Sequence, residues 1–318
     1  MSVALAVAPA PFFEDVRCYG CGAPGGAPFV EAEDDLTGKP GRFTFVRCEN
    51  CGLAFQNPRV SIDHIRAYYD DEYIAHRRTN WGLLHRVFER AMDSLDAAKD
   101  RIVSRYVTLG RESAVLDVGC GVGTFLQRLR TRYGSAVTGV DFKDLSDRRT
   151  LGGVEFHCGL FYEAALADSR FDAVTMWHFL EHDYDPRRSL RTARRVLKPG
   201  GHLIVEVPRL DSVTFRLFGH RWPGLQAPQH TVLFDREHLR QFVSDAGFEI
   251  VDYLPYGAFP AYFYLFTGSA FLFLKGRGLN LKRAIYPYFA GRVLTAPIFV
   301  FERSLNLAMQ TVICRRTS

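Results

Sequence analysis

Four of the seven cysteines form two Cys-x-x-Cys pairs near the start of the chain. Two thiolates at this spacing reach one side of a zinc ion, and a second pair completes the tetrahedron without leaving an open position. The sequence therefore predicts a structural zinc site with the ligands Cys18, Cys21, Cys48 and Cys51. Four unrelated reduced thiols are the alternative interpretation. A DNA-binding finger is excluded because no basic helix follows either pair.

The residues around these cysteines predict a small zinc ribbon. Gly22 and Gly52 each follow a pair, where a tight turn around a metal favours a residue without Cβ. Residues 42–47 alternate apolar and polar side chains, as a strand of a hairpin between the pairs would. We assign residues 1–59 to this zinc-ribbon module.

A second group of residues that could form a functional site is a glycine-rich turn in the middle of the chain. Residues 114–118 form a short apolar strand, residues 119–123 read Gly-Cys-Gly-Val-Gly, and residues 124–129 begin an amphipathic helix. Such glycines let the backbone approach a ligand at the carboxyl end of a strand. Asp141 ends the next apolar run, 136–140, and a carboxylate there accepts hydrogen bonds from both hydroxyls of a ribose. This pattern alone fits several nucleotide-type cofactors.

Segments in the middle of the chain resemble the motifs of class I S-adenosylmethionine-dependent methyltransferases. They are LDVGCGVGTFL followed by VTGVD, then FDAVTMWHFLEH at residues 171–182 and VLKPGGHLIVEVP at residues 196–208. The resemblance covers residues 112–256. It implies a Rossmann-like α/β fold with seven mostly parallel strands, the last of them antiparallel. It also implies S-adenosylmethionine as the cofactor and methyl transfer as the reaction.

The resemblance further implies which residues hold the methyl donor. The glycine turn lines the methionine and ribose portions of the donor, and Asp141 holds the ribose hydroxyls. The expected donor-binding residues are Asp117, Gly119, Cys120, Gly121, Gly123, Asp141, Phe142, Leu160 and Trp177. The family often has an acidic residue after the third strand to meet the adenine amino group. This sequence has Leu160 there, so the adenine contact is left open.

The acceptor side of the reaction has four candidate catalytic residues: His178, Glu181, His182 and His230. Methyl transfer is a displacement at an already activated carbon, so the protein must chiefly align donor and acceptor. A hydroxyl acceptor also needs a base near neutral pKa, which histidine can provide. The first three candidates follow the fourth strand, at the edge where open α/β sheets bind ligands. Loop positioning is the alternative role of Glu181 and His182, and metal assistance by Glu181, His182, Asp183 and Asp185 is another.

The remaining elements must position these residues. Residues 60–110 are expected to form a helical cap over the donor, with an amphipathic run from Trp81 to Val107. Residues 111–257 together with 307–318 are expected to form the methyltransferase domain. Its sixth strand is predicted at 248–253 and its antiparallel seventh at 309–315. Four aromatic residues are expected either in the wall of the acceptor pocket or in the core: Trp177, Phe179, Trp222 and Phe234.

Residues 258–306 form a hydrophobic insertion where the fold needs only a hairpin turn. No charge occurs in the 22 positions from 253 to 274, and Lys and Arg follow at 275–283 before a second apolar stretch. A single membrane crossing would separate the last two strands of one sheet. We therefore expect an in-plane or re-entrant helical pair whose basic residues meet anionic headgroups. A lid over the acceptor or a dimer contact is the alternative.

Composition narrows the possible partners. The net charge of +5 is mild and most basic residues are scattered among acidic ones, which gives no case for nucleic-acid binding. The first ten residues lack the basic region of a secretion signal, so we expect a cytoplasmic protein, peripheral on the inner face of the membrane. The segments at 51–59 and 68–73 are similar to those of bacterial methyltransferases found among genes for surface glycans, lipids and natural products.

These observations together predict O-methylation of a hydrophobic, lipid or lipid-linked glycan acceptor. Two alternatives remain open. One is C- or N-methylation of a small soluble metabolite, such as a natural product or sugar nucleotide. The other is a non-catalytic binding protein that keeps the fold. The sequence fixes neither the acceptor nor the oligomeric state.

Overall fold

The computed structural model describes residues 12–69, 85–144, 151–275, 277–279, 281–299 and 304–317. Its main body is a seven-stranded sheet with strand order β12-β13-β10-β9-β6-β7-β8. The strands are β6 (Ala114–Val118), β7 (Ala136–Asp141), β8 (Glu155–Cys158), β9 (Phe171–Trp177), β10 (Leu197–Pro208), β12 (Phe248–Leu254) and β13 (Met309–Arg316). Strand β13 runs antiparallel to both β10 and β12, and the pairs from β10 to β8 are parallel. The predicted fold class is confirmed, including the antiparallel strand at the end of the chain.

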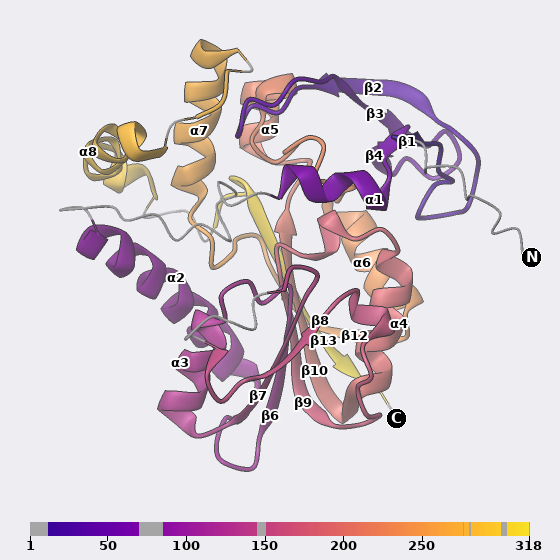
Figure 1. Ribbon diagram of the computed structural model, residues 1–318, viewed down its shortest axis with the longest axis vertical. Coiled ribbons are helices and arrows are strands. Elements are labelled where there is room, and N and C mark those ends of the chain that lie inside the picture. The colour runs from indigo at the N-terminus through magenta and orange to yellow at the C-terminus, as the bar shows by residue number, and fades with distance from the viewer. Residues whose placement is uncertain are drawn as a thin grey trace, which may run out of the picture.

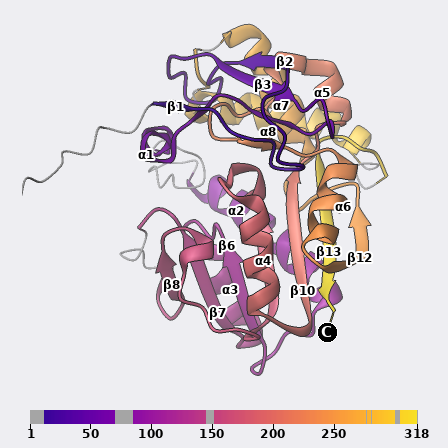
Figure 2. The ribbon, with the colours of Figure 1, turned by 90° about the vertical axis from the view of Figure 1, so that its right-hand side faces the viewer.

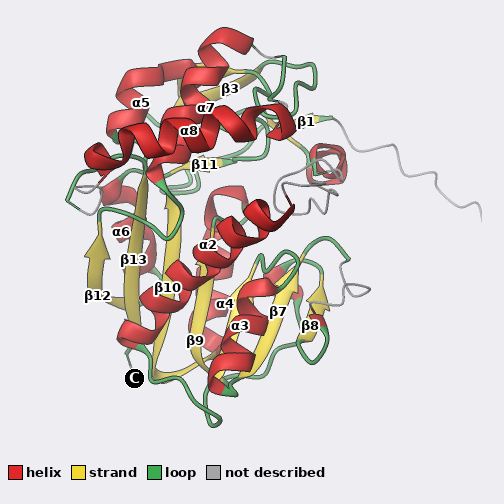
Figure 3. Cartoon of the chain, turned by 90° about the vertical axis from the view of Figure 1, so that its left-hand side faces the viewer, coloured by secondary structure: helices red, strands yellow, loops and turns green. Residues whose placement is uncertain are grey.

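Helices cover both faces of this sheet. One face carries α2 (His85–Tyr106) and α3 (Thr124–Tyr133), as Figure 3 shows, and the other carries α4 (Pro186–Val196) and α6 (Arg236–Asp245), as Figure 2 shows. Because both faces are covered, the central strands are apolar on both sides. Helix α2 agrees with the later part of the helical run predicted from Trp81, and residues 70–84 lie outside the described part.

The cysteine pairs lie in turns beside a second, smaller sheet. It contains β2 (Ala27–Ala32), β3 (Phe43–Arg47), β4 (Ala54–Gln56) and β11 (Val232–Leu233), in the order β11-β4-β3-β2. Strand β3 confirms the strand predicted at residues 42–47. Strand β11 comes from the segment after β10 and pairs with β4, so the ribbon and the larger domain share a sheet. Strand β1 (Phe13–Glu14), before the ribbon, pairs with β5 (Arg59–Val60), after it, and α1 (Ile62–Ile65) comes next.

The hydrophobic insertion folds as two helices, α7 (Ala261–Leu274) and α8 (Leu281–Phe299). Together with α5 (Val213–Phe218) and the ribbon they lie above the carboxyl ends of the parallel strands, in the upper part of Figure 1. Within the described residues, no helix combines the length and the apolar character needed to span a bilayer. The upper layer therefore covers the edge of the sheet where α/β folds bind their ligands. The short 3₁₀ turns are at Arg66–Tyr68, Phe161–Glu163, Leu180–His182 and Gly219–Arg221.

Candidate active site

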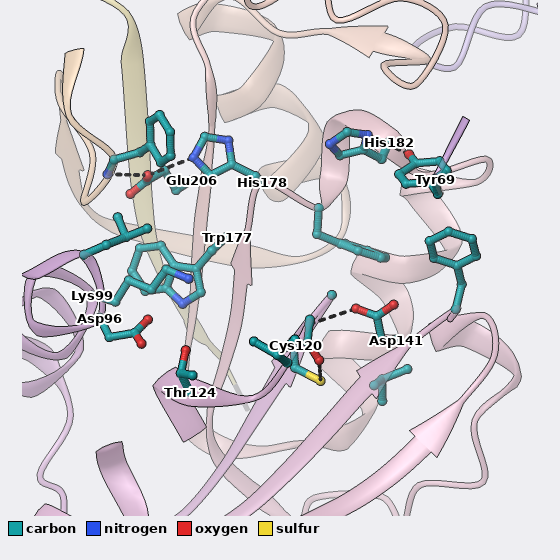
Figure 4. Close-up of a pocket in the computed structure, with 18 of the residues that line it drawn as sticks. Tyr69, Asp96, Lys99, Cys120, Thr124, Asp141, Trp177, His178, His182 and Glu206 are labelled. Carbon is teal, nitrogen blue, oxygen red and sulfur yellow. Dashed lines mark hydrogen bonds and ion pairs between the residues drawn. The ribbon is translucent and has the colours of Figure 1, made fainter. Parts of the chain in front are cut away.

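A cavity of about 1470 Å³ lies between the carboxyl edge of the large sheet and the upper layer. Its wall combines the glycine turn, the ends of β7 and β9, one face of α2, and side chains of the ribbon and of α7. In Figure 4, Asp141 and Cys120 lie on one side of this cavity, and Asp96, Lys99 and Trp177 lie on the other. The cavity is therefore large enough for two ligands and is walled by both layers.

The glycine turn after β6 has the backbone that the sequence predicts. Gly119, Gly121 and Gly123 have φ angles of 73°, 53° and 77°, a left-handed conformation that favours glycine. The amide nitrogens of Gly119 and Cys120 donate to the carbonyl oxygen of Val140 at 2.8 and 3.1 Å. The turn is thus bound to the end of β7, and the backbone from Gly119 to Val122 lines the cavity.

Asp141 closes this part of the cavity from the end of β7. Its carboxylate accepts hydrogen bonds from the amide nitrogens of Gly121 at 2.9 Å and Lys143 at 3.1 Å, and its side chain is buried. Burial is the largest effect on its pKa, which is raised above the usual value. Phe142 and Leu160 also lie in the wall, as expected of donor-binding residues.

Two of the expected donor-binding residues lie behind the wall. Asp117 is buried and accepts a hydrogen bond from the Thr175 hydroxyl at 2.6 Å. Burial raises the pKa of Asp117 to about 6. Gly123 begins α3 and, like Asp117, is not part of the cavity lining. These two residues position the turn rather than face the space that a ligand would occupy.

The opposite side of the cavity uses residues that sequence reasoning missed. Asp96 and Lys99 of α2 line it beside Trp177, and the Lys99 ammonium lies 5.7 Å from the centre of the Trp177 ring. The indole nitrogen of Trp177 is buried and has no hydrogen-bond partner among the residues that the structure describes. A signal for the two α2 residues was present: Met92, Asp96 and Lys99 are spaced i, i+4, i+7, which places two charges on the apolar face of the helix.

His178 is held between two buried carboxylates. Its Nδ1 lies 3.4 Å from Oε1 of Glu181, and its Nε2 lies 3.4 Å from Oε1 of Glu206. The residue also has a left-handed φ of 53°, which a non-glycine residue rarely adopts. Partial burial lowers the pKa of His178, but the two carboxylates outweigh it and raise the pKa to about 9. Both ring nitrogens therefore face carboxylates, and the ring is a cation at neutral pH.

Glu206, on β10, is a further site residue that sequence reasoning missed. Its carboxylate accepts hydrogen bonds from the amide nitrogens of Ala258 and Phe259 at 2.6 and 3.0 Å and from the Thr311 hydroxyl at 3.3 Å. Figure 4 shows it beside His178. A single charged residue inside the apolar strand 203–208 was the available signal. Glu206 connects the loop after β9 to the start of the hydrophobic insertion.

His182 and His230 lie together in the cavity wall, with ring centres 4.4 Å apart. Nδ1 of His182 lies 3.1 Å from the carbonyl oxygen of Gln229 and 2.9 Å from the Tyr69 hydroxyl, and Nδ1 of His230 lies 2.8 Å from the carbonyl oxygen of Gly224. Burial is the main reason that the pKa values of both rings are lowered. Both rings are therefore neutral at physiological pH.

Asp183 and Asp185 have local structural roles. The Asp183 carboxylate accepts from the amide nitrogen of Asp185 at 3.0 Å, and the Asp185 carboxylate caps α4 by accepting from the amide nitrogen of Arg188 at 2.9 Å. The four-residue metal group considered from the sequence is therefore not brought together as such.

The aromatic part of the wall differs from the expected one. Of the two positions that the sequence left open, Trp177 and Phe179 take the cavity wall, whereas Trp222 and Phe234 are buried in the core. The Trp222 indole nitrogen donates to the Thr214 hydroxyl at 3.0 Å, which binds the ring inside the upper layer. The insertion supplies other aromatic residues to the cavity: Phe259, Phe263 and Tyr264.

The four ribbon cysteines converge as predicted. Their sulfur atoms all lie within 4.8 Å of one another, with Sγ–Sγ distances of 3.5 Å for Cys18–Cys51 and Cys21–Cys48. Gly22 and Gly52 have φ angles of 75° and 82°, in the left-handed region that the two turns require. The donor set and the closed arrangement fit a tetrahedral zinc ion.

Comparison with known proteins agrees with this geometry. The 98-residue match to a ubiquinone biosynthesis O-methyltransferase of Alkalilimnicola ehrlichii is 40% identical and covers 28% of this chain and 39% of the relative. A protein of the same name from Xanthomonas oryzae pv. oryzae is 37% identical over 142 residues, or 42% of this chain and 57% of the relative. The chain thus spans between about a third and somewhat over half of the length of the curated relatives it matches.

A solved structure of phosphoethanolamine N-methyltransferase 2 from Haemonchus contortus, in complex with S-adenosylmethionine, is 17% identical to this chain. The match covers 69% of this chain and 52% of that one, with a TM-score of 0.48. A family model described as a methyltransferase domain matches residues 83–253, more than half of the chain. The chain therefore belongs to the methyltransferase domain family.

Proposed function

We propose that the protein transfers a methyl group from S-adenosylmethionine to a hydroxyl of a hydrophobic acceptor. The observation that carries this proposal is one continuous cavity with two chemically different ends. One end has the glycine turn and Asp141, which suit a nucleoside. The other end has apolar side chains from three separate segments: Leu36, Ile62, Ile65, Phe259 and Phe263. Relatives that are named ubiquinone biosynthesis O-methyltransferases support both a hydroxyl and a hydrophobic acceptor.

The reaction requires only alignment and loss of one proton. The acceptor oxygen attacks the methyl carbon, an O–C bond forms as the C–S bond breaks, and the sulfonium becomes the neutral thioether of S-adenosylhomocysteine. The hydroxyl proton leaves to a base or to water. Of the four predicted catalytic residues, His182 and His230 are the pair beside which we position the acceptor hydroxyl, because both rings line the cavity and Nδ1 of each faces a protein oxygen.

His178 has a different role in this proposal. Its two nitrogens are already paired with Glu181 and Glu206, so it is a positioning residue for the loop that carries His182. Through Glu206 and the amide nitrogens of Ala258 and Phe259, it also fixes the start of the insertion. In this proposal, His178 and Glu206 together hold the loop after β9 against the start of the insertion, and so hold the donor side of the cavity at a fixed distance from its apolar wall.

The acceptor can be found by comparing cells with and without the enzyme. We expect mass spectrometry of lipid extracts to reveal a hydrophobic compound that is about 14 Da heavier when the protein is present. Purified protein with methyl-labelled S-adenosylmethionine should then label the demethylated form of that compound. If label appears only in water-soluble metabolites, or on nitrogen or carbon, the hydroxyl-on-a-hydrophobe assignment is wrong.

We further propose that the insertion holds the protein at a membrane surface. It exposes large apolar side chains: Phe273 is 85% exposed, Val293 74% and Tyr286 66%. Lys275, Arg277 and Arg292 are exposed among the same two helices. Exposed apolar side chains beside cations suit the boundary of an anionic bilayer. A peripheral position would bring the apolar end of the cavity close to a lipid-soluble acceptor.

Flotation with anionic liposomes tests this attachment. The variant Phe273→Glu/Val293→Glu should lower membrane partitioning by more than about 100-fold, since it removes two large apolar side chains and the burial of each is worth about 1.5–3 kcal/mol. Val251→Glu is the matched control, because Val251 is a 46% exposed apolar residue on the distant strand β12. Equal recovery of all three proteins would rule out the membrane role and favour the lid or dimer alternative.

A further inference from the structure

A second group of potential metal ligands, apart from the ribbon cysteines, consists of His182 and His230, which line the cavity, and Glu181, which is buried outside the lining. Glu181, His182 and His230 each offer one ligand atom, and these atoms lie within 4.8 Å of one another. In a tetrahedral site with bonds of about 2.0–2.2 Å to the ion, two ligand atoms lie roughly 3.5 Å apart. Small side-chain rotations would therefore let all three bind one ion.

The state of Glu181 is a second, independent observation. Glu181 is 1% exposed, and neither of its carboxylate oxygens has a hydrogen-bond partner among the described residues. Its nearest charged neighbour is Nδ1 of His178 at 3.4 Å. Glu206, the other carboxylate facing His178, accepts three hydrogen bonds, so the two are not equivalent. Apart from the imidazole of His178, no polar or charged group among the described residues is recorded as a partner of this buried carboxylate, and a bound ion is one ordinary reason for such a state.

The two imidazoles are oriented as metal ligands usually are. Carbonyl oxygens only accept hydrogen bonds, so Nδ1 of His230 donates to Gly224. Nδ1 of His182 faces both the Gln229 carbonyl at 3.1 Å and the Tyr69 hydroxyl at 2.9 Å. The Gly224 contact fixes the tautomer of His230 that leaves the lone pair on Nε2, and the Gln229 contact favours the same tautomer of His182. A backbone carbonyl that holds the remote nitrogen of a ligating histidine is the common outer shell of metal sites.

We propose that Glu181, His182 and His230 bind a divalent transition-metal ion in the acceptor part of the cavity. Two imidazoles and one carboxylate are a ligand set that zinc and similar ions accept while keeping open positions. Both rings line the cavity, so those positions would face the acceptor. An acceptor hydroxyl bound there would lose its proton to water more easily, because the ion stabilises the alkoxide.

The test uses the full chain with zinc retained in the ribbon. After dialysis against a chelator that removes weakly held ions, Co²⁺ is titrated and followed by calorimetry and visible absorption. We expect one Co²⁺ per chain, with d–d bands but without the sulfur-to-metal charge-transfer bands that thiolate ligands produce. No donor or acceptor is present, so failure here would leave the proposed methyl transfer standing.

Variants identify the ligands. Glu181→Gln removes the charge at equal size, and His230→Asn keeps a donor for the Gly224 carbonyl but removes Nε2. Each should weaken Co²⁺ binding by more than about 100-fold, since loss of outer-shell partners alone costs roughly 10–100-fold. His220→Asn is the matched control, because His220 is exposed and outside the cavity wall. Absence of Co²⁺ binding in the natural sequence, or equal binding by all variants, would overturn the proposal.

Discussion

Replacement of Asp141 by alanine is expected to weaken binding of S-adenosylhomocysteine by about 1.5–3 kcal/mol, or roughly 10–150-fold in Kd. The carboxylate ends β7 at the cavity wall, where it would accept hydrogen bonds from both ribose hydroxyls. It already accepts from the amide nitrogens of Gly121 and Lys143, so its removal also loosens the turn that contacts the donor. Isothermal titration calorimetry with the purified protein measures the change directly.

Two further variants separate the causes of this loss. Asp141→Asn keeps the side-chain volume but lacks the charge, so it should lose only part of the affinity. Asp245→Ala removes an exposed carboxylate on α6 that pairs with Arg187, far from the cavity, and should leave Kd unchanged. If Asp141→Ala binds as tightly as the natural sequence while remaining folded, the ribose assignment is wrong.

The sequence predicted the parts of the site that depend on neighbouring residues. A strand, a glycine turn and a helix follow one another over residues 114–133, so their shape is set locally by alternation and by left-handed glycines. The two cysteine pairs are also local turns. The strand at 309–316 was predictable because its apolar pattern ends the chain, although its partners β10 and β12 are distant in sequence.

Residues whose roles depend on distant contacts were not predictable. Glu206 binds amide nitrogens about fifty positions away, and no local pattern indicates that the insertion begins there. Strand β11 has two residues and is defined by its pairing with β4 of the ribbon. Trp222 was expected as a possible wall residue, but its burial depends on how α5 and α7 pack in the upper layer. Composition alone gives an aromatic residue no preference between wall and core.

The same argument explains why the candidate catalytic residues needed the structure. His178, His182 and His230 are equally good bases by residue type. Their neighbours distinguish them. Carboxylates flank both nitrogens of His178, whereas the other two rings contact carbonyl oxygens through Nδ1, which in His182 also contacts the Tyr69 hydroxyl. Hydrogen-bond partners, and not histidine itself, decide which ring faces the cavity with a free lone pair.

The second large expected effect is the loss of stability when a cysteine of the ribbon is replaced. We propose that the four ribbon cysteines hold one structural zinc ion. The module has little core of its own: Leu53 and Phe55 pack with residues of the methyltransferase domain such as Val232. Zinc binding supplies about 10–16 kcal/mol to small zinc-finger peptides at pH 7. Cys48→Ser should therefore lower the free energy of unfolding of the ribbon by several kcal/mol and remove the zinc that otherwise resists dialysis. Elemental analysis and hydrogen exchange of β2–β4 measure the two changes.

The effect of Cys48→Ser on function should be confined to the acceptor end of the cavity. Leu36, Ile62 and Ile65 reach the acceptor wall from the ribbon and the segment after it, whereas Asp141 and the glycine turn belong to the large sheet. Cys48→Ser should thus retain binding of S-adenosylhomocysteine but lose methylation of a hydrophobic acceptor. Cys158→Ser is the matched control, since Cys158 is exposed and outside both the ribbon and the cavity wall. Folded protein without zinc, or a Cys48→Ser variant as stable as the control, would refute the structural role of the metal. Parallel loss of donor binding would instead mean that the ribbon supports the whole site.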